Sequence, residues 1–247
     1  MSNSPRPWLS VVIPIKDERE NLPPLTQQLL KVLESCEQSR SSRFELIYVD
    51  DGSTDGSGAL LDQLATQHPS ITVLHFDRNY GKTAALDAGF THAGGDLILT
   101  MDGDLQMNPA DIPTLLPSAS QYDLVCGWRQ HRHDTLLRKI SSRAGNLIRR
   151  AITGDRLHDT GCELKLYRRA VVKKIQLFEG LHRFMPALAL MHGFTVTEVP
   201  VRHYPRIHGV SKYGLGNRLF KVLYDLIGFR WMRARVLKYK ILPGKRP

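Results

Sequence analysis

The sequence predicts an α/β protein with a doubly wound, mainly parallel sheet, and two observations support this fold class. Apolar runs that suit buried strands alternate with amphipathic runs that suit helices through the first hundred residues. Several strand runs end in acidic residues, and open parallel sheets bind ligands at that end of their strands. The length of 247 residues and the hydrophobic content of 42% allow a full core and favour one large domain over two small ones.

The alternation places the elements in order along the chain. Strands are expected at 9–15, 44–49, 71–76 and 97–101, with further strands at 164–167 and 194–201. Helices are expected after Pro23 and Pro24, around 60–64, over 82–92 and over 184–192. Strands that alternate with helices of this length indicate a parallel sheet that is covered on both faces.

The fourth strand run ends in two carboxylates, Asp102 and Asp104, with only Gly103 between them. Two like charges held this close repel each other unless a cation lies between them. The spacing therefore favours a hard divalent ion, Mg²⁺ or Mn²⁺, bound by oxygen, with Gln106 as an additional neutral ligand. An ordinary turn after a strand remains open at this point, because Asp and Gly are common turn residues.

The overall charge and the cysteines bound the function. The formal net charge of +10 indicates an anionic partner such as a nucleic acid, a nucleotide, a lipid phosphate or an acidic membrane surface. Cys36, Cys126 and Cys162 lie outside any C-x-x-C pattern and are expected to be reduced, as in a cytosolic protein. The first residues lack the apolar core of a signal peptide, and no stretch of 18 uncharged apolar residues occurs, so we expect no membrane-spanning segment.

A short glycine-lysine motif, Gly81-Lys82-Thr83, has the form of the end of a phosphate-binding P-loop. That motif needs a glycine at position 76, which is Phe76, so the P-loop interpretation fails. A local anion site at a helix N-terminus and simple helix capping both remain open.

Two later regions are strongly basic. Residues 128–156 hold eight Lys and Arg residues against two Asp, which predicts either a solvated helix face or several phosphate-binding arginines. The tail over 214–247 combines basic residues with apolar and aromatic ones in the pattern of a basic amphipathic helix. Such a helix suits the plane of an anionic bilayer, and packing against the main domain or against a membrane-spanning partner also remains open.

The motifs occur in an order that resembles family 2 glycosyltransferases of the GT-A fold. At the strand ends these motifs are Pro14 with Asp17-Glu18, Val49 to Ser53, and Asp102 to Gln106. The later motifs are similar to those of the dolichol-phosphate mannose synthase and bacterial polyprenyl-phosphate glycosyltransferase branch. They lie at residues 127–129, 138–143, 159–162 and 165–169, and at Arg206 with 209–213. The sequence departs from the family pattern at Lys16 and Asp17, where tyrosine and asparagine are usual, and at Glu163, where a small residue is common.

The resemblance implies one GT-A domain over 8–213, with a nucleotide-binding half and an acceptor half, followed by the helical tail over 214–247. It also implies a role for each matching residue. The donor-binding residues are Pro14, Glu18, Asp51, Asp102, Arg206 and Lys212, and the metal ligands are Asp102, Asp104 and Gln106. The acceptor-phosphate residues are Arg129, Arg138 and Ser142, and the catalytic residues are Asp104, Asp159, Arg129 and Arg138.

The function that the resemblance implies is inverting, metal-dependent transfer of a mannose- or glucose-type sugar from a GDP- or UDP-linked donor to a polyprenyl phosphate. The protein is expected in the cytoplasm, peripherally at the inner face of the membrane. A phosphate acceptor is already ionised at neutral pH, so it needs positioning more than a strong base. Asp159 is expected to orient the acceptor or an arginine, with a base role given less weight.

The sequence is also compatible with two other functions. A family 2 enzyme with a saccharide or cell-envelope acceptor would need a base, for which Asp159 is the candidate. The basic charge also permits nucleic-acid binding, but the chain lacks the interleaved aromatic residues and the recognition motifs of such proteins. We therefore expect no nucleic-acid partner.

Overall fold

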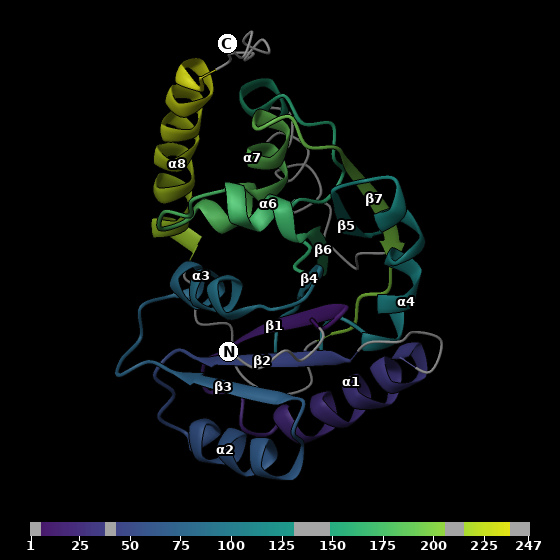
Figure 1. The fold of residues 1–247 in the computed structure, drawn as a ribbon. Coiled ribbons are helices and arrows are strands. Elements are labelled where there is room, and N and C mark those ends of the chain that lie inside the picture. The colour runs from purple at the N-terminus through teal and green to yellow at the C-terminus, as the bar shows by residue number, and fades with distance from the viewer. Residues whose placement is uncertain (1–5, 38–42, 131–148, 206–214, 238–247) are drawn as a thin grey trace, which may run out of the picture.

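The computed structural model of the chain describes residues 6–37, 43–130, 149–205 and 215–237 (Figure 1). Within them a seven-stranded sheet runs in the order β3-β2-β1-β4-β6-β5-β7. The strands are β1 (Leu9–Ile15), β2 (Phe44–Asp50), β3 (Ile71–His75), β4 (Leu97–Thr100), β5 (Leu124–Arg129), β6 (Lys165–Arg168) and β7 (Val196–Val201).

The sheet is mainly parallel, as predicted. Strand β1 pairs in parallel with β2 and with β4, β2 pairs in parallel with β3, and β5 pairs in parallel with β7. Only β6 runs the other way, antiparallel to both β4 and β5. Strands β4 and β5 therefore run in the same direction on either side of β6, and their carboxyl ends lie at the same edge of the sheet.

Helices cover both faces of the sheet (Figure 1). The α-helices are α1 (Leu22–Glu37), α2 (Ser57–Gln67), α3 (Lys82–His92), α4 (Ile112–Leu115), α6 (Arg169–Lys174), α7 (Met185–Met191) and α8 (Leu215–Arg235). Short 3₁₀ helices cover Pro109–Asp111, Pro117–Ser120 and Leu181–Phe184.

Alternating residues of β1 point to two separate cores, because successive side chains of a strand face opposite sides. Val11 and Ile13 pack with the leucines of α1, whereas Val12 packs with α3. Helix α3 lies very close to the strand, since a Cβ at Gly89 would lie 2.2 Å from Cγ1 of Val12. This two-sided burial explains why β1 reads as a continuous apolar run.

The sequence predictions found the first four strands and α1 to α3, and missed β5 and α6. Strand β5 was not predicted because Gly127 interrupts its apolar run. A Cβ at Gly127 would lie 2.8 Å from Cys162 Sγ. Helix α6 has only six residues, which is too short for a clear helical period.

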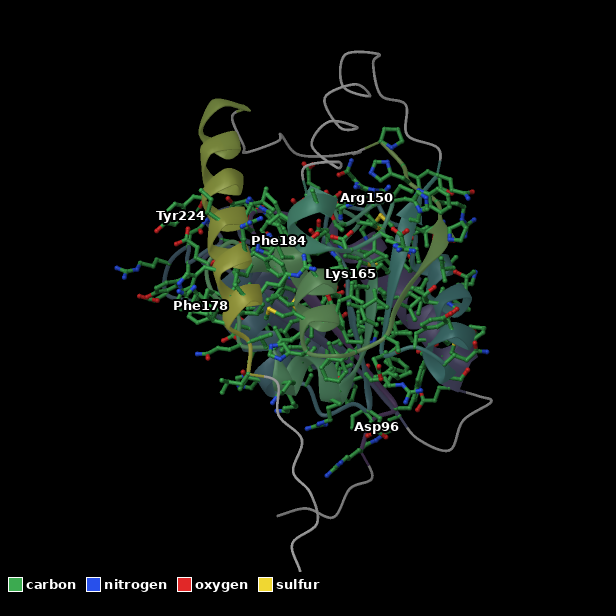
Figure 2. The ribbon with its side chains drawn as sticks, turned by 90° about the horizontal axis from the view of Figure 1, so that it is seen from above. Asp96, Arg150, Lys165, Phe178, Phe184 and Tyr224 are labelled. Atoms are coloured by element: carbon green, nitrogen blue, oxygen red, sulfur yellow. The ribbon has the colours of Figure 1, made fainter. Side chains whose placement is uncertain are left out.

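Helix α8 packs one side against the second half of the protein. Leu226 and Phe229 are buried, and the ring of Phe229 stacks on Phe184 with 5.9 Å between centroids. Figure 2 shows Tyr224 on the opposite side of α8 from Phe184. Among the helices of the described ranges, none is long and apolar enough to cross a membrane. The expected domain boundary at 213/214 lies outside the described residues.

Candidate functional site

The loops that follow β1 and β2 are tied to each other. Lys16 Nζ donates to the carbonyl of Gly52 at 2.6 Å. The carboxylate of Asp17 accepts the backbone N–H of Thr54 at 2.7 Å, and the N–H of Asp17 donates to Ser53 Oγ at 2.9 Å. Lys16 and Asp17, two of the three residues that depart from the family pattern, therefore fix the shape of the neighbouring strand end.

The three residues expected to contact the nucleotide lie along this same edge. Pro14 pairs with Val49 in the register of β1 and β2. The carboxylate of Glu18 accepts a hydrogen bond from Asn21 Nδ2 at 2.6 Å. Asp51 is buried, and its carboxylate accepts the backbone N–H groups of Tyr80 at 2.6 Å and Gly81 at 3.0 Å. Asp51 thus links the end of β2 to the turn that begins α3.

The two candidate metal ligands follow β4 in a tight turn. The turn crosses the end of β1, where a Cβ at Gly103 would lie 2.4 Å from Cδ1 of Ile15, so a larger residue would require the Ile15 side chain to move. Asp104 is buried, and its Oδ1 accepts the N–H of Gln106 at 3.1 Å. The carbonyl of Gln106 in turn accepts the N–H of Tyr204 at 2.9 Å. The chain just before Arg206 is therefore anchored beside these acids.

Asp102 faces Lys82, which the sequence predicted to be part of either an anion site or a helix cap. Lys82 Nζ lies 2.5 Å from Asp102 Oδ1 and 3.2 Å from Glu163 Oε1. A second lysine, the buried Lys165, lies 3.5 Å from Glu163 Oε2 (Figure 2). Lysine and carboxylate chains from three segments thus form one charged cluster at the edge of the sheet.

The pKa values in this cluster follow from burial and from the neighbouring charges. Burial raises the pKa of Asp102, and the carboxylates of Glu163 and Asp104 raise it further against the opposing effect of Lys82. Burial would also raise the pKa of Glu163, but Lys165 and Lys82 together hold it below its usual range.

These residues fit a divalent cation that is shared with a phosphate ligand. Carboxylate oxygens are hard ligands of the kind that Mg²⁺ and Mn²⁺ prefer, and Mg²⁺ is commonly held by one or two carboxylates together with substrate phosphates. In the described parts of the chain, no group of three or more His, Cys, Asp and Glu residues has the arrangement of a self-sufficient metal site. Asp102 and Asp104 supply the two carboxylates of a site in which substrate phosphates complete the coordination of the cation.

The end of β5 carries an arginine clamped by an aspartate. Arg129 Nε donates to Asp159 Oδ2 at 2.6 Å, and Nη2 donates to Oδ1 at 2.9 Å. Asp159 is buried and is itself fixed by Glu198 of β7, which accepts the N–H of Asp159 at 2.8 Å. Burial lowers the pKa of Arg129, but Asp159 raises it above the ordinary value, so the guanidinium stays charged. This geometry favours orientation of Arg129 over a base role for Asp159.

Other arginines of the basic segment bind the protein itself. Arg149 and Arg150 both donate to the carbonyl of Leu157, at 2.8 and 2.9 Å. Arg149 also lies 3.1 Å from Asp155. Arg149 and Arg150 thus stabilise the turn that leads to Asp159. This role differs from both predictions for residues 128–156, a solvated helix face and phosphate binding. Four predicted site residues lie outside the described residues, namely Arg138, Ser142, Arg206 and Lys212.

Sequence reasoning also missed a buried histidine near the cluster. His182 Nδ1 lies 2.7 Å from Thr83 Oγ1, and Thr83 accepts the N–H of Gly180 at 3.0 Å. Burial lowers the pKa of His182 to about 4, so the ring is neutral at pH 7. The 3₁₀ segment that contains His182 is thereby fastened to the first turn of α3, next to Lys82.

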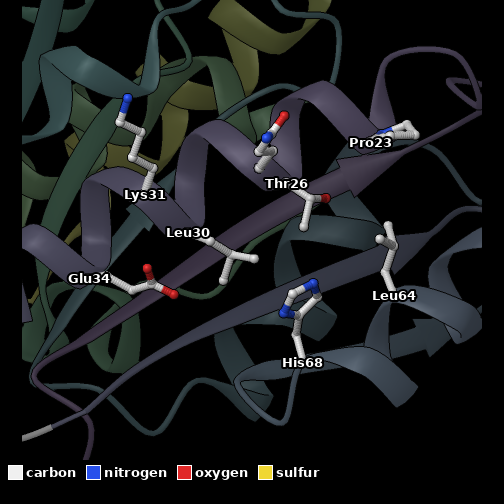
Figure 3. A pocket seen from close by; sticks show the side chains of 8 residues that line it. Pro23, Thr26, Leu30, Lys31, Glu34, Leu64 and His68 are labelled. Carbon is white, nitrogen blue, oxygen red and sulfur yellow. The ribbon is translucent and has the colours of Figure 1, made fainter.

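A groove of about 450 Å³ lies elsewhere, between α1 and α2 (Figure 3). Thr26 and Leu30 line it from α1, and Leu64 and His68 line it from the other side. It contains none of the predicted site residues, and it belongs to the outer helices and not to the carboxyl edge of the sheet.

Comparisons with known proteins place the chain in a family. Residues 10–176 match the family described as Glycosyl transferase family 2. The chain is 40% identical over 242 residues to a dodecaprenyl-phosphate galacturonate synthase from Rhizobium johnstonii, covering 96% of this chain and 69% of that protein. It is 39% identical over 221 residues to an undecaprenyl-phosphate 4-deoxy-4-formamido-L-arabinose transferase from Salmonella choleraesuis, covering 89% and 66%. The matched region thus spans about two thirds of each relative.

Solved structures give the fold. Glucosyl-3-phosphoglycerate synthase from Mycobacterium tuberculosis, in complex with Mn²⁺, UDP and phosphoglyceric acid, aligns with a TM-score of 0.66 at 15% identity, covering 94% of this chain and 80% of that one. Its complex with Mg²⁺ and UDP aligns with a TM-score of 0.64 at 16% identity, covering 94% and 81%. The fold is GT-A. The chain therefore belongs to glycosyl transferase family 2 and is a glycosyltransferase.

Proposed function

We propose that the protein transfers a sugar, with inversion, from a nucleotide diphosphate sugar to a polyprenyl phosphate. The observation that carries the proposal is the pairing of two charged groups at one edge of the sheet. The acids Asp102 and Asp104 follow β4, and Arg129 ends β5. Only β6 separates these two strands, so they lie about 10 Å apart. That spacing suits a sugar held between a donor diphosphate and an acceptor phosphate.

The donor side is assigned to the β1 to β4 half. A divalent cation, Mg²⁺ or Mn²⁺, would supply positive charge to the nucleoside diphosphate as it leaves. Asp102 and Asp104, with Gln106, would hold that cation. Pro14, Glu18 and Asp51 would contact the nucleotide, and Arg206 and Lys212 would bind the donor diphosphate. A structure with the same fold is a complex with Mn²⁺ and UDP, which supports this assignment.

The acceptor side is assigned to the end of β5. Arg129 would bind the acceptor phosphate, together with Arg138 and Ser142. A guanidinium has five N–H donors, of which Asp159 takes two, so the clamp fixes the plane of the group without neutralising its whole donor set. Asp159 would therefore act as a positioning residue. The names of both relatives contain a polyprenyl phosphate, which supports a phosphate acceptor for this protein.

Helix α8 is assigned to the membrane surface. Tyr224, Ile227 and Trp231 lie three and four residues apart and are all more than half exposed. The guanidinium of Arg235 lies 4.9 Å from the ring of Trp231. Exposed aromatic and apolar side chains next to arginines suit the interface of an anionic bilayer. We place the protein peripherally on the inner face of the cytoplasmic membrane, where a lipid phosphate would reach the edge of the sheet.

A transfer assay tests the proposal. Purified protein with Mg²⁺ or Mn²⁺ is incubated with undecaprenyl phosphate and with a panel of UDP- and GDP-linked hexoses, hexuronic acids and 4-deoxy-4-formamido-L-arabinose. Transfer to the lipid phosphate from one donor, with an inverted anomeric configuration in the product, is the expected result. Transfer from none of these donors would contradict the proposal, and transfer to a saccharide acceptor alone would establish the alternative.

A further inference from the structure

We propose that Lys82 is a built-in counter-cation of the Asp102 and Glu163 carboxylates, and that a divalent cation binds by displacing its ammonium group. The inference rests on the proposed function, because it assumes that Asp102 is a metal ligand. It adds a role for Lys82 that neither the family match nor the relatives supply. The ammonium occupies a place among the acids that a metal ion would otherwise need.

The contacts carry the first step. Lys82 Nζ lies 2.5 Å from Asp102 Oδ1 and 3.2 Å from Glu163 Oε1, so one ammonium bridges two carboxylates. A metal ion on the same oxygen of Asp102 would lie next to the ammonium, and two cations this close repel each other strongly. In the proposed arrangement, metal binding at this oxygen therefore moves the ammonium away.

The backbone of Lys82 is held while its side chain can turn. Lys82 begins α3. The preceding Gly81 donates its N–H to the buried Asp51, and the following Thr83 is bound to His182 and to Gly180. These contacts fix the start of the helix from both sides. A lysine side chain has four flexible carbons, so its ammonium can leave Asp102 without a change in the fold.

The rest of the cluster tolerates this movement. Glu163 keeps a second cation, Lys165, when Lys82 departs. Asp102 then has the metal ion in place of the ammonium, and the phosphates of a nucleotide would offset the added positive charge. The side chain of Asp102 is 31% exposed, so an ion from solution can reach it. In this arrangement the ammonium stabilises the acids without a metal and weakens metal binding until a nucleotide is present.

Binding of Mn²⁺ to the protein, followed by electron paramagnetic resonance of the free ion, tests the inference without any assay of activity. Lys82→Met should bind Mn²⁺ on the order of tenfold more tightly than the wild type in the absence of nucleotide. Lys82→Arg, which retains the cation, should bind about as weakly as the wild type. Arg78→Met is the matched control, because it removes one exposed positive charge from the same loop, and it should change the affinity less than about twofold.

Three results would overturn the inference. The first is an unchanged Mn²⁺ affinity in Lys82→Met while the wild type binds Mn²⁺ in the presence of UDP, which would leave the proposed function standing. The second is an equal gain in Arg78→Met, which would indicate a general effect of charge. The third is an absence of Mn²⁺ binding in every variant with and without UDP or GDP, which would overturn the proposed function as well. If Lys82→Met does not fold, a wild-type crystal structure with Mn²⁺ and UDP decides, and Lys82 Nζ must lie beyond 4 Å from Asp102.

Discussion

In the donor half an acidic side chain holds the loop after β2, whereas in the acceptor half two basic side chains hold backbone around β6. After β2, Asp51 accepts backbone N–H groups. Arg149, which precedes β6, donates to the carbonyl of Leu157, and Arg168, the last residue of β6, donates to the carbonyl of Ala119. In these contacts a charged side chain forms a hydrogen bond with a backbone group and stabilises the loop. At the proposed reaction centre charged side chains pair with each other instead: Lys82 with Asp102 and Glu163, Lys165 with Glu163, and Arg129 with Asp159.

The charged side chains thus fall into two classes. Those of the first class bind backbone groups and shape the loops, and those of the second class pair with each other at the proposed site and are available to ligands. A backbone group cannot leave its partner without a change in the fold, but a lysine or arginine side chain can change partners. We therefore expect substitutions in the first class to lower stability and substitutions in the second class to lower activity. The following changes test this division, from the largest expected effect to the smallest.

Asp104→Asn should reduce sugar transfer by about 10³-fold or more, because it removes a negative charge from the proposed metal site. The amide oxygen of asparagine can still accept the N–H of Gln106, so the fold should persist. Transfer rates with Mn²⁺, compared with a thermal unfolding curve, check both statements. A variant that loses activity only in proportion to a fall in stability would place Asp104 in the structural class.

Gly52→Ala should lower the free energy of unfolding by about 3 kcal/mol, because Gly52 has a φ of 65° and its Cβ would lie 2.5 Å from the backbone carbon of Arg78. Gly193→Ala is the matched control, since Gly193 has a φ of 85° with no atom within 4 Å of its Cβ. That variant should lose only about 1 kcal/mol, from the backbone conformation alone. Urea unfolding measures both values, and equal losses would show that the contact with Arg78 is unimportant.

Arg129→Lys should reduce kcat/KM for the acceptor by about 10- to 100-fold, because a lysine cannot reproduce the two-point contact with Asp159. Asp159→Asn should produce a similar loss if Asp159 acts by positioning Arg129. In the double variant the two losses should then not add. Full additivity, or an Asp159→Asn effect that appears only as a lost acidic limb in the pH profile, would instead support a base role.

His75→Gln should change stability only at lower pH, and by a few tenths of a kcal/mol because the His75 side chain is 41% exposed and solvent screens its ion pairs. Burial lowers the pKa of His75, but Asp62 and Asp50 raise it above 6.5. The charged histidine is therefore favoured in the folded state, so its contribution is complete below pH 6.5 and disappears as the pH rises through the folded pKa. Unfolding curves at pH 5.5 and 8.5 measure the change, and a larger contribution at pH 8.5 would contradict this sign.

The donor half was more predictable from sequence than the acceptor half. Strand β1 was predicted with the bounds that the structure gives, because a long apolar run on a strand buried on both faces has few alternatives. Strand β5 was missed because Gly127 interrupts its apolar run, and helix α6 was missed because it has only six residues. The charge density of residues 128–156 predicted either a solvated helix face or phosphate-binding arginines, yet Arg149 and Arg150 bind a backbone carbonyl that no side-chain pattern reveals.

The candidate site was predictable as a set of positions but not as a set of contacts. The motifs indicated Asp102 and Asp104 as a pair and Arg129 as a second charge. They did not indicate that Lys82 bridges Asp102 and Glu163, because these residues are far apart in sequence and meet only when α3, β4 and β6 pack together. Glu198, which fixes Asp159 from β7, carries no motif at all.

The most direct test of the division between a donor side and an acceptor side is calorimetric titration of UDP and GDP, with and without Mn²⁺, into the wild type, Asp104→Asn and Arg129→Lys. We predict that the wild type binds one of the two nucleotides and needs Mn²⁺ for tight binding. Asp104→Asn should lose the Mn²⁺-dependent part of the affinity, whereas Arg129→Lys should retain it. Equal binding with and without Mn²⁺ in the wild type, or equal losses in the two variants, would contradict the account.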